Sequence, residues 1–277
     1  MSDSPPNTGL DPVRLVGRVF VALSTVAFAF PIYWTLNTAL KPGALVNTFP
    51  PTLVPWPLQV DALVRVVTND RIRGAVVDSL LVTGGTTALA MGIGTAAGYG
   101  LSRMRARTGQ TVALALLVPR AVPQVALILP AFFILAWLGL DDSHLGLVIL
   151  YLSFDVPLAT WLMRGHFARV PRRFEEAAHV DGYSQVGTLR RVTLPLAWPG
   201  FAATTVLVWI FAWNEFLFAV ILSGADVVPY TVLASMMGNN WTAVTALAVV
   251  VTLPPTLVLV TLRRHVVEGL TLGLTRL

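Results

Sequence analysis

One polar segment, which lies between two apolar stretches of membrane length, carries small and charged residues at a spacing suited to docking rather than to catalysis. Its pattern positions are Glu176, Ala177, Ala178, Asp181, Gly182, Leu194 and Pro195. The alanines let a groove of another protein approach a short helix closely, and Gly182 accepts the left-handed conformation that commonly follows a helix C-terminus. A second short helix should begin near Ser184 and be stopped by Leu194-Pro195 and Trp198-Pro199, since proline cannot continue a helix interior but suits the first turn of the next one. The segment therefore predicts a helical hairpin that another protein recognises.

Ionisable residues at membrane depth form the second group that could do chemistry. Counted from the arginine-rich ends of their antiparallel spans, Arg120 and Asp155 each lie about 9 residues in, which at ~1.5 Å per residue places them at similar depth. Because an unpaired charge in hydrocarbon is costly, we expect an ion pair between them. The alternative is that Arg120 lines a cavity and donates hydrogen bonds to substrate hydroxyls. The candidates for a substrate path are Arg120, Gln124, Asp155, Asn214, Glu215, Asn239 and Asn240.

The amide side chains in this second group fit more than one role. Asn239 and Asn240 precede Trp241 in an irregular run, where turns, amides and an aromatic ring suit the binding of polyols. Asn214 and Glu215 fit the same role or, alternatively, a contact that packs two helices together. Since the sequence shows neither a close pair of acidic residues nor a cluster of metal ligands, it predicts no catalytic residue and no metal site.

The elements that hold these residues are predicted to be membrane-spanning helices. Of the 277 residues, 55% are hydrophobic and only 12% are charged, and the mean hydropathy is +0.72. A helix needs about 20 mostly apolar residues to cross a bilayer, and the first apolar run is too long for the core of a signal peptide. We expect an all-α polytopic protein with about six spans, a polar loop over 164–198 and a tail over 263–277. The expected spans are 16–40, 76–101, 111–135, 145–163, 199–222 and 243–262, the last bent at Pro254-Pro255.

The orientation in the membrane is predicted from the distribution of positive charge. Lys41, Arg65, Arg71 and Arg73 lie on one side, and fourteen of the nineteen basic residues lie on the other. Because positively charged loops stay in the cytoplasm, both termini and the loop over 164–198 are predicted to be cytoplasmic. The net charge of +5 is thus explained by topology and lipid headgroups, and no nucleic-acid partner is expected.

Several enzyme classes are excluded by missing residues. The chain has no cysteine, so disulfides, thiolate metal sites and a cysteine nucleophile are ruled out. It also has no phosphate-binding G-x-x-x-x-G-K-S/T loop, no H-E-x-x-H zinc helix and no G-x-S-x-G nucleophile elbow. Gly92, Gly94, Gly98 and Gly100 lie inside an expected span, where Gly94 and Gly98 form a small-residue face for close helix packing. Energy for any transport must therefore come from another subunit.

The complete spacing of the polar segment resembles the E-A-A…G…I-x-L-P loop of binding-protein-dependent ABC importer permeases. The only departure from this pattern is Val192, which stands where the family usually has isoleucine. An isolated E-A-A would also fit a hairpin that only links two spans, but here the whole spaced pattern is present. Further stretches resemble the carbohydrate, maltose-type branch, in particular the smaller permease of such a pair. These stretches are Leu40-Lys41-Pro42, Pro123-Gln124-Val125 through Pro130, Trp213-Asn214-Glu215-Phe216, and Val267-Glu268-Gly269-Leu270-Thr271 through Gly273.

The resemblance implies a type I ABC importer architecture in a bacterial-type cytoplasmic membrane. This chain would form half the pore for a sugar, oligosaccharide or related polyol that an external solute-binding protein delivers. Its partners would be a second permease, more plausibly a different chain, and two cytoplasmic ATPase subunits that carry ATP and Mg, with no cofactor on this chain. The E-A-A loop would couple to the ATPase, led by Glu176 and Gly182. Arg172, Arg173, Arg190 and Arg191 would pair with acidic groups there or serve only as topology anchors.

Two other function classes fit part of the sequence. A membrane-embedded lipid-modifying enzyme would use Arg120, Asp155 and Glu215 as a cluster, but it does not explain the E-A-A segment. A self-contained secondary transporter should show internal repeats with broken helices at matching positions, and no convincing repeat is found. The resemblance also implies that the tail reaches the ATPase, although Leu274-Thr275-Arg276-Leu277 departs from the small-residue finish common in the family.

Overall fold

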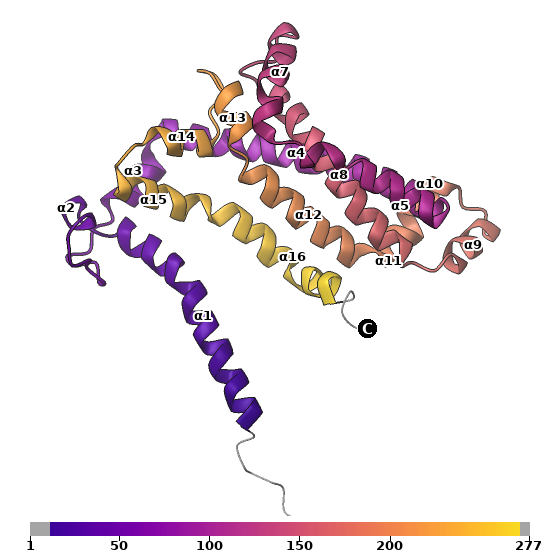
Figure 1. The fold of residues 1–277 in the computed structure, drawn as a ribbon, viewed down its shortest axis with the longest axis horizontal. Coiled ribbons are helices and arrows are strands. Elements are labelled where there is room, and N and C mark those ends of the chain that lie inside the picture. Colours follow the sequence, from indigo (N-terminus) through magenta and orange to yellow (C-terminus); the bar gives the residue numbers. More distant parts are fainter. Residues whose placement is uncertain (1–11, 272–277) are drawn as a thin grey trace, which may run out of the picture. The chain divides into compact units, whose positions relative to one another are not determined.

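The computed structural model describes the backbone of residues 12–271 and the side chains of residues 15–265. Within this range every regular element is a helix, which confirms the all-α prediction (Figure 1). The chain divides into two compact units, which we describe separately. The first consists of Met1–Val66 with Asn239–Val250, and the second of Val67–Gly238 with Val251–Leu277.

The first unit is built around one long apolar helix. Its elements are α1 (Pro12–Ala39), α2 (Gly43–Val46), most of α3 (Asp61–Thr68) and α15 (Trp241–Val251). The segment between α2 and α3 folds back on the last turns of α1, where the side chains of Tyr33 and Asn37 both donate to the carbonyl of Leu53. Lys41 is buried, with its ammonium 4.6 Å from the centre of the Trp34 ring. The end of α1 is therefore held by polar contacts within this unit.

The second unit holds the remaining helices. They are α4 (Asp70–Arg103), α5 (Ala106–Ala115), α6 (Val118–Ala121), α7 (Gln124–Trp137), α8 (His144–Ala168), α9 (Arg173–Val180), α10 (Gln185–Thr188), the π-helix η1 (Leu189–Thr193), α11 (Leu194–Leu196), α12 (Trp198–Trp213), α13 (Leu217–Leu222), α14 (Tyr230–Met236) and α16 (Leu253–Thr271). The helices α4, α8 and α12 pack against one another, and α16 packs on α12. Two clusters of buried apolar side chains, one around Phe218 and one around Phe167, form the core.

Among the residues that the structure describes, four helical stretches are long and apolar enough to cross a membrane, and the number rises to six if two bent pairs each count as one span. The four are Leu15–Ala39, Asp70–Arg103, His144–Ala168 and Trp241–His265. The bent pairs are Ala106–Ala121 with Gln124–Trp137, and Gln185–Leu196 with Trp198–Trp213. A count of four to six spans agrees with the expected polytopic protein of about six spans. The end of the expected tail, residues 272–277, lies outside the described residues.

Prolines and the residues before them set the positions of the bends. Val122 adopts an extended conformation before Pro123, and the helices on either side meet at 87°. The expected span over 111–135 is therefore sharply bent. The helix from Gln185 ends at Leu196, between Leu194-Pro195 and Trp198-Pro199, which confirms the expectation that these two pairs stop it. The π-helical turn η1, in which the Leu194 N–H bonds the Leu189 carbonyl, widens the helix just before the proline.

Two glycines allow α4 and α8 to approach each other closely. A Cβ atom built on Gly94 would lie 2.5 Å from the Cβ of Ala159, and one on Gly98 would lie 2.8 Å from the backbone nitrogen of Arg164. No atom comes within 4 Å of the corresponding position on Gly92. The prediction that Gly94 and Gly98 form a packing face is therefore confirmed.

Gly94→Val is expected to destabilise the folded protein by about 1–3 kcal/mol, because the added methyl groups overlap the backbone of α8. The matched control is Gly92→Val, which changes the helix propensity equally but meets no neighbour in the described structure. Thermal unfolding of both variants in lipid nanodiscs measures the difference. Equal losses of stability would contradict the close packing of α4 on α8.

A single carboxylate organises the turn between α13 and α14. Asp142 lies between α7 and α8 with a φ of 48°, and its two oxygens accept hydrogen bonds from the backbone N–H groups of four consecutive residues at 2.7–3.0 Å. The donors are Gly224, Ala225, Asp226 and Val227. Burial raises the pKa of Asp142, but the four backbone hydrogen bonds outweigh this effect and the pKa lies below its usual value.

Asp142→Asn is expected to reduce the free energy of unfolding at pH 7 by about 2 kcal/mol, since the amide nitrogen cannot accept these bonds. Because the pKa of Asp142 is lowered by folding, its stabilisation is complete above the unfolded pKa of ~3.9 and disappears as the pH falls through the lower folded value. The difference between the two proteins should therefore shrink in acid. Melting curves across pH test this, with the exposed neighbour Asp141 replaced by asparagine as the control. A difference that is unchanged in acid would show that the carboxylate charge is not the cause.

Candidate functional site

The E-A-A residues lie on α9, whose two faces differ in exposure. Glu175 and Ala178, three positions apart, are buried, whereas Glu176 and Ala177 are exposed and Val180 is 88% exposed. The exposed face, which is the candidate docking face, is thus formed by Glu176, Ala177 and Val180. Ala178 was expected to be part of this face, but it packs inward. Within the described part of the chain, the Glu176 carboxylate has no hydrogen-bond or ion-pair partner, so it is available to another protein.

Gly182 ends α9 in the way that its position predicts. Its φ is +83°, the Gly182 N–H donates to the carbonyl of His179, and the Tyr183 N–H donates to the carbonyl of Ala178, both at 3.0 Å. This pair of hydrogen bonds is the Schellman arrangement, which requires a left-handed residue after the helix. Asp181 lies at the C-cap, between the helix and this glycine. The chain can therefore reverse within two residues and enter the next helix.

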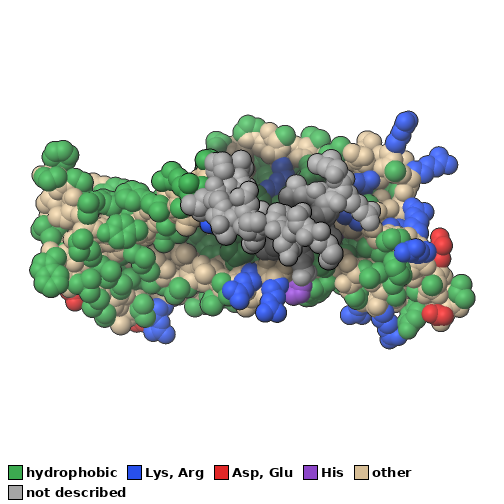
Figure 2. Space-filling view, turned by 90° about the horizontal axis from the view of Figure 1, so that it is seen from below, with side chains coloured by type: hydrophobic (Ala, Val, Ile, Leu, Met, Phe, Trp, Pro, Cys, Tyr) green, Lys and Arg blue, Asp and Glu red, His purple; other side chains and the backbone are tan. Residues whose placement is uncertain are grey.

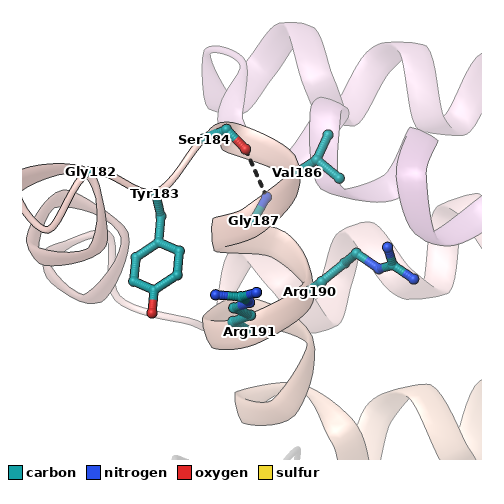
Figure 3. Close-up of a pocket in the computed structure, with 7 residues that line it drawn as sticks. All are labelled: Gly182, Tyr183, Ser184, Val186, Gly187, Arg190 and Arg191. Carbon is teal, nitrogen blue, oxygen red and sulfur yellow. Dashed lines mark hydrogen bonds between the residues drawn. The ribbon is translucent and has the colours of Figure 1, made fainter.

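A groove lies at this turn and is lined by residues of the turn and of the second helix. Its volume is about 640 Å³, and its lining residues are Gly182, Tyr183, Ser184, Val186, Gly187, Arg190 and Arg191 (Figure 3). Ser184 caps α10, since its hydroxyl accepts a hydrogen bond from the N–H of Gly187 at 3.2 Å. The Arg191 guanidinium lies 5.4 Å from the centre of the Tyr183 ring, while Arg190 points away from it (Figure 3). The groove therefore combines apolar, aromatic and cationic groups.

Basic side chains gather at the end of the second unit that carries α5, α9 and α10 (Figure 2). Those that are exposed there are Arg105, Arg107, Arg169, Arg172, Arg173, Arg190 and Arg191. Such a surface suits either anionic lipid headgroups or an acidic protein partner. Pro195 is exposed at the end of the second helix, and Leu194 is partly buried.

The sequence did not single out Glu175, the buried neighbour of Glu176. Its carboxylate accepts hydrogen bonds from the Arg103 guanidinium at 2.5 and 3.1 Å and from the Thr193 hydroxyl at 2.7 Å. Glu175 is 6% exposed and Thr193 is fully buried. Helical spacing places Glu175 on the same face as Ala178, but only the structure shows that this face is the buried one.

Four of the seven residues proposed for a substrate path line one small cavity at membrane depth. The cavity has a volume of about 60 Å³ and is lined by Arg120, Gln124, Tyr151, Phe154, Asp155, Phe211, Ala212, Glu215 and Phe218. The expected ion pair is confirmed, with 3.7 Å between Arg120 Nη1 and Asp155 Oδ1. Arg120 Nη1 also donates to the carbonyl of Phe154 at 2.6 Å. This volume holds a water or two but is well below the roughly 300–1,000 Å³ typical of ligand pockets.

The other three proposed residues make local contacts. Asn214 is exposed at the end of α12, where its side-chain amide donates to the carbonyl of Ile210 at 2.8 Å. Asn240 accepts a hydrogen bond from the N–H of Ala243 in the first turn of α15, and the Asn239 carbonyl accepts one from Trp241. Asn239 and Asn240 belong to the first unit, and they are exposed within it. None of the three lines the cavity.

Glu215 has a structural role in addition to its place at the cavity. Its carboxylate accepts hydrogen bonds from the N–H groups of Phe218 and Ala219 at the start of α13. Its backbone carbonyl accepts one from the hydroxyl of Thr231. Among the described residues, no group of three or more His, Cys, Asp or Glu side chains could hold a metal ion.

Comparison with known proteins agrees with a helical protein of several membrane spans. The family model described as "Binding-protein-dependent transport system inner membrane component" matches residues 88–271, which include both the hairpin and the cavity. The chain belongs to this family. The permease is therefore a multi-pass membrane protein, and the alternatives of a lipid-modifying enzyme and a self-contained secondary transporter are not favoured.

Relatives of similar length support the same assignment. The permease is 30% identical over 272 residues to the probable ABC transporter permease protein y4oR of Sinorhizobium fredii, covering 96% of this chain and 97% of that one. It is 30% identical over 250 residues to the trehalose transport system permease protein SugB of Mycobacterium tuberculosis, covering 88% and 90%. In fold it is similar to a chain of a bacterial ABC transporter that imports the acidic polysaccharide alginate. The TM-score is 0.75 and the identity 22%, over 94% of this chain and 99% of that one.

Proposed function

We propose that the permease forms half of the translocation pore of an ATP-driven importer and is coupled through the hairpin of α9 and α10 to a separate ATPase subunit. The observation that carries the proposal is the exposed face of Glu176 and Ala177 beside a groove held open by the left-handed turn at Gly182. An exposed, unpaired carboxylate on α9 and a preformed groove at the adjoining turn suit a protein partner. ATP and Mg would be bound by the ATPase subunits, with no cofactor on this chain.

The solute is proposed to be a sugar, an oligosaccharide or a related polyol. The role of the trehalose transport system permease SugB, which is 30% identical to this chain, supports that class. Delivery by an external solute-binding protein is supported by the description of the family. Arg120, Gln124, Asp155 and Glu215 offer donors and acceptors for hydroxyl groups, and their cavity would have to widen before a sugar could enter it. A second permease, more plausibly a different chain, would complete the pore.

The proposed orientation places both termini and the hairpin in the cytoplasm. It is supported by the exposed arginines around α9 and α10, because positively charged loops are retained on the cytoplasmic side. Since the chain has no cysteine, single introduced cysteines report on orientation without further substitutions. In right-side-out vesicles, a membrane-impermeant maleimide should label Asp70→Cys and leave Arg107→Cys unlabelled. The reverse pattern would overturn the orientation.

A tagged pull-down from native membranes tests the function itself. The intact permease should recover an ATPase, a second permease and, in the presence of solute, a binding protein, each identified by mass spectrometry. The recovered binding protein can then be screened against trehalose, maltose and polyols by tryptophan fluorescence. If no ATPase is recovered under conditions that preserve other membrane complexes, the importer proposal fails.

A further inference from the structure

The start of α9 is joined to the last residue of α4 by three hydrogen bonds, two that α4 donates and one that it accepts. The Glu175 carboxylate accepts from the Arg103 guanidinium, and the Arg172 guanidinium donates to the Arg103 carbonyl at 3.1 Å. The carbonyls at a helix C-terminus have no partner within the helix, so the second contact satisfies a group that α4 leaves open. Each bond involves an ionised group, which makes it stronger than a neutral hydrogen bond.

The same carboxylate also binds the second helix of the hairpin. The hydroxyl of Thr193, in η1, donates to Glu175 Oε1 at 2.7 Å, and Arg103 donates to this same oxygen. Glu175 and Thr193 are both buried, so water does not compete for these bonds. One oxygen atom therefore connects α9, η1 and α4.

The helix α4 extends this connection to the opposite end of the second unit. It has 34 residues, which at ~1.5 Å per residue make it about 50 Å long. Near its N-terminus, Asp78 lies 2.9 Å from His144 and accepts a hydrogen bond from the N–H of Val228, and Ser79 accepts one from the N–H of Tyr230. A displacement of the C-terminal end of α4 would thus be carried to the loop between α13 and α14.

The hairpin is covalently continuous only with α8 and α12. We propose that Glu175 is the positioning residue that makes α9 and α4 one rigid body, so that movement of the hairpin also moves α4. Without this carboxylate, α4 would respond to the hairpin only through its packing on α8 and α12. This inference rests on the proposed function, in which an ATPase subunit moves the hairpin.

A distance measurement between two spin labels tests the rigid link without knowledge of the solute. Met104 and Phe174 are exposed at the end of α4 and the start of α9, outside the face of Glu176, Ala177 and Val180, and the cysteine-free chain lets Met104→Cys and Phe174→Cys carry the only labels on this subunit. The complex with its ATPase is measured in nanodiscs, without nucleotide and after trapping with ATP and vanadate. A single narrow distance, the same in both states, is expected. A distance that changes between the states would overturn the proposal.

Glu175→Gln keeps the size of the side chain but removes its charge. In this variant the narrow distribution is expected to broaden and to differ between the two states, while the ATPase still co-purifies because Glu176 and Gly182 are intact. Arg103→Ala should have the same effect, and its matched control Arg105→Ala, an exposed arginine two residues away, should not. An unchanged narrow distance in both Glu175→Gln and Arg103→Ala would overturn the proposal.

Two further results separate the positioning role from misfolding and from the proposed function. The reversed pair Arg103→Glu with Glu175→Arg should restore the narrow distance, which a protein that had simply lost its fold would not regain. If the intact chain recovers no ATPase, the proposed function fails, whereas the nucleotide-free distances in nanodiscs still decide whether Glu175 holds α9 to α4. A reversed pair as broad as the single variants would count against the link.

Discussion

Gly182→Val is expected to lower the affinity of the permease for its ATPase subunit roughly tenfold, because a side chain in the left-handed conformation costs about 1–2 kcal/mol and 1.4 kcal/mol is a factor of ten. The strain acts on the turn that orients the exposed face of α9 toward the groove beside α10. No atom of the described structure lies within 4 Å of the added Cβ, so the effect comes from the backbone and not from a clash. Quantitative co-purification from detergent-solubilised membranes measures the loss.

The matched control for this variant is Gly182→Asn. Asparagine adopts the left-handed conformation more readily than other non-glycine residues, so the Schellman turn should persist and the ATPase should still be recovered. Glu176→Lys, which reverses the exposed charge without changing the turn, should also reduce recovery. Full recovery with Gly182→Val would show that the turn does not position the docking face.

Arg120→Met is expected to destabilise the permease by about 3 kcal/mol, the low end of the range for breaking a buried ion pair. Arg120 is the only cationic residue that lines the cavity in the described structure, so its removal leaves Asp155 and Glu215 without a positive partner. The side chain of Asp155 is only 5% exposed, and water cannot solvate it well. Thermal unfolding in nanodiscs at neutral pH measures the effect.

The converse substitution should cost less. In Asp155→Leu, Arg120 keeps its hydrogen bond to the Phe154 carbonyl and its contact with the Phe211 ring, 5.0 Å away, and its side chain is 23% exposed. The double variant Arg120→Met with Asp155→Leu should be more stable than Arg120→Met alone, because no unpaired charge remains from the pair. If the double variant is the least stable of the three, the ion pair is not the source of the effect.

Local rules were sufficient to predict the helical class and the helical hairpin of α9 and α10. Long apolar runs leave the backbone no partners in lipid except its own, so helices follow from composition. The turn at Gly182 and the cap at Ser184 follow from the conformations that these residues favour, and both were located from sequence. The pairing of Arg120 with Asp155 was also predicted, because equal depth in adjacent spans and the cost of an isolated charge leave few alternatives.

The bends were harder to predict, because proline has opposite effects in different contexts. Before Pro123, the extended residue Val122 breaks the helix and turns it by 87°. Pro195, in contrast, is accommodated, since the π-helical turn before it rearranges the hydrogen bonds of the helix. That rearrangement depends on contacts of η1 with other elements, among them the bond from Thr193 to Glu175, which the sequence does not reveal.

By itself, the sequence determined the all-helical membrane fold, the family and the hairpin, because each depends on composition or on residues close together in the chain. Only the tertiary structure decided which of two adjacent glutamates is buried. Successive residues of a helix point about 100° apart, so Glu176 faces solvent while Glu175 faces Arg103, which is 72 positions earlier in the chain. A partner so distant in sequence is set by the packing of α4 against the rest of the second unit, and no local pattern encodes it.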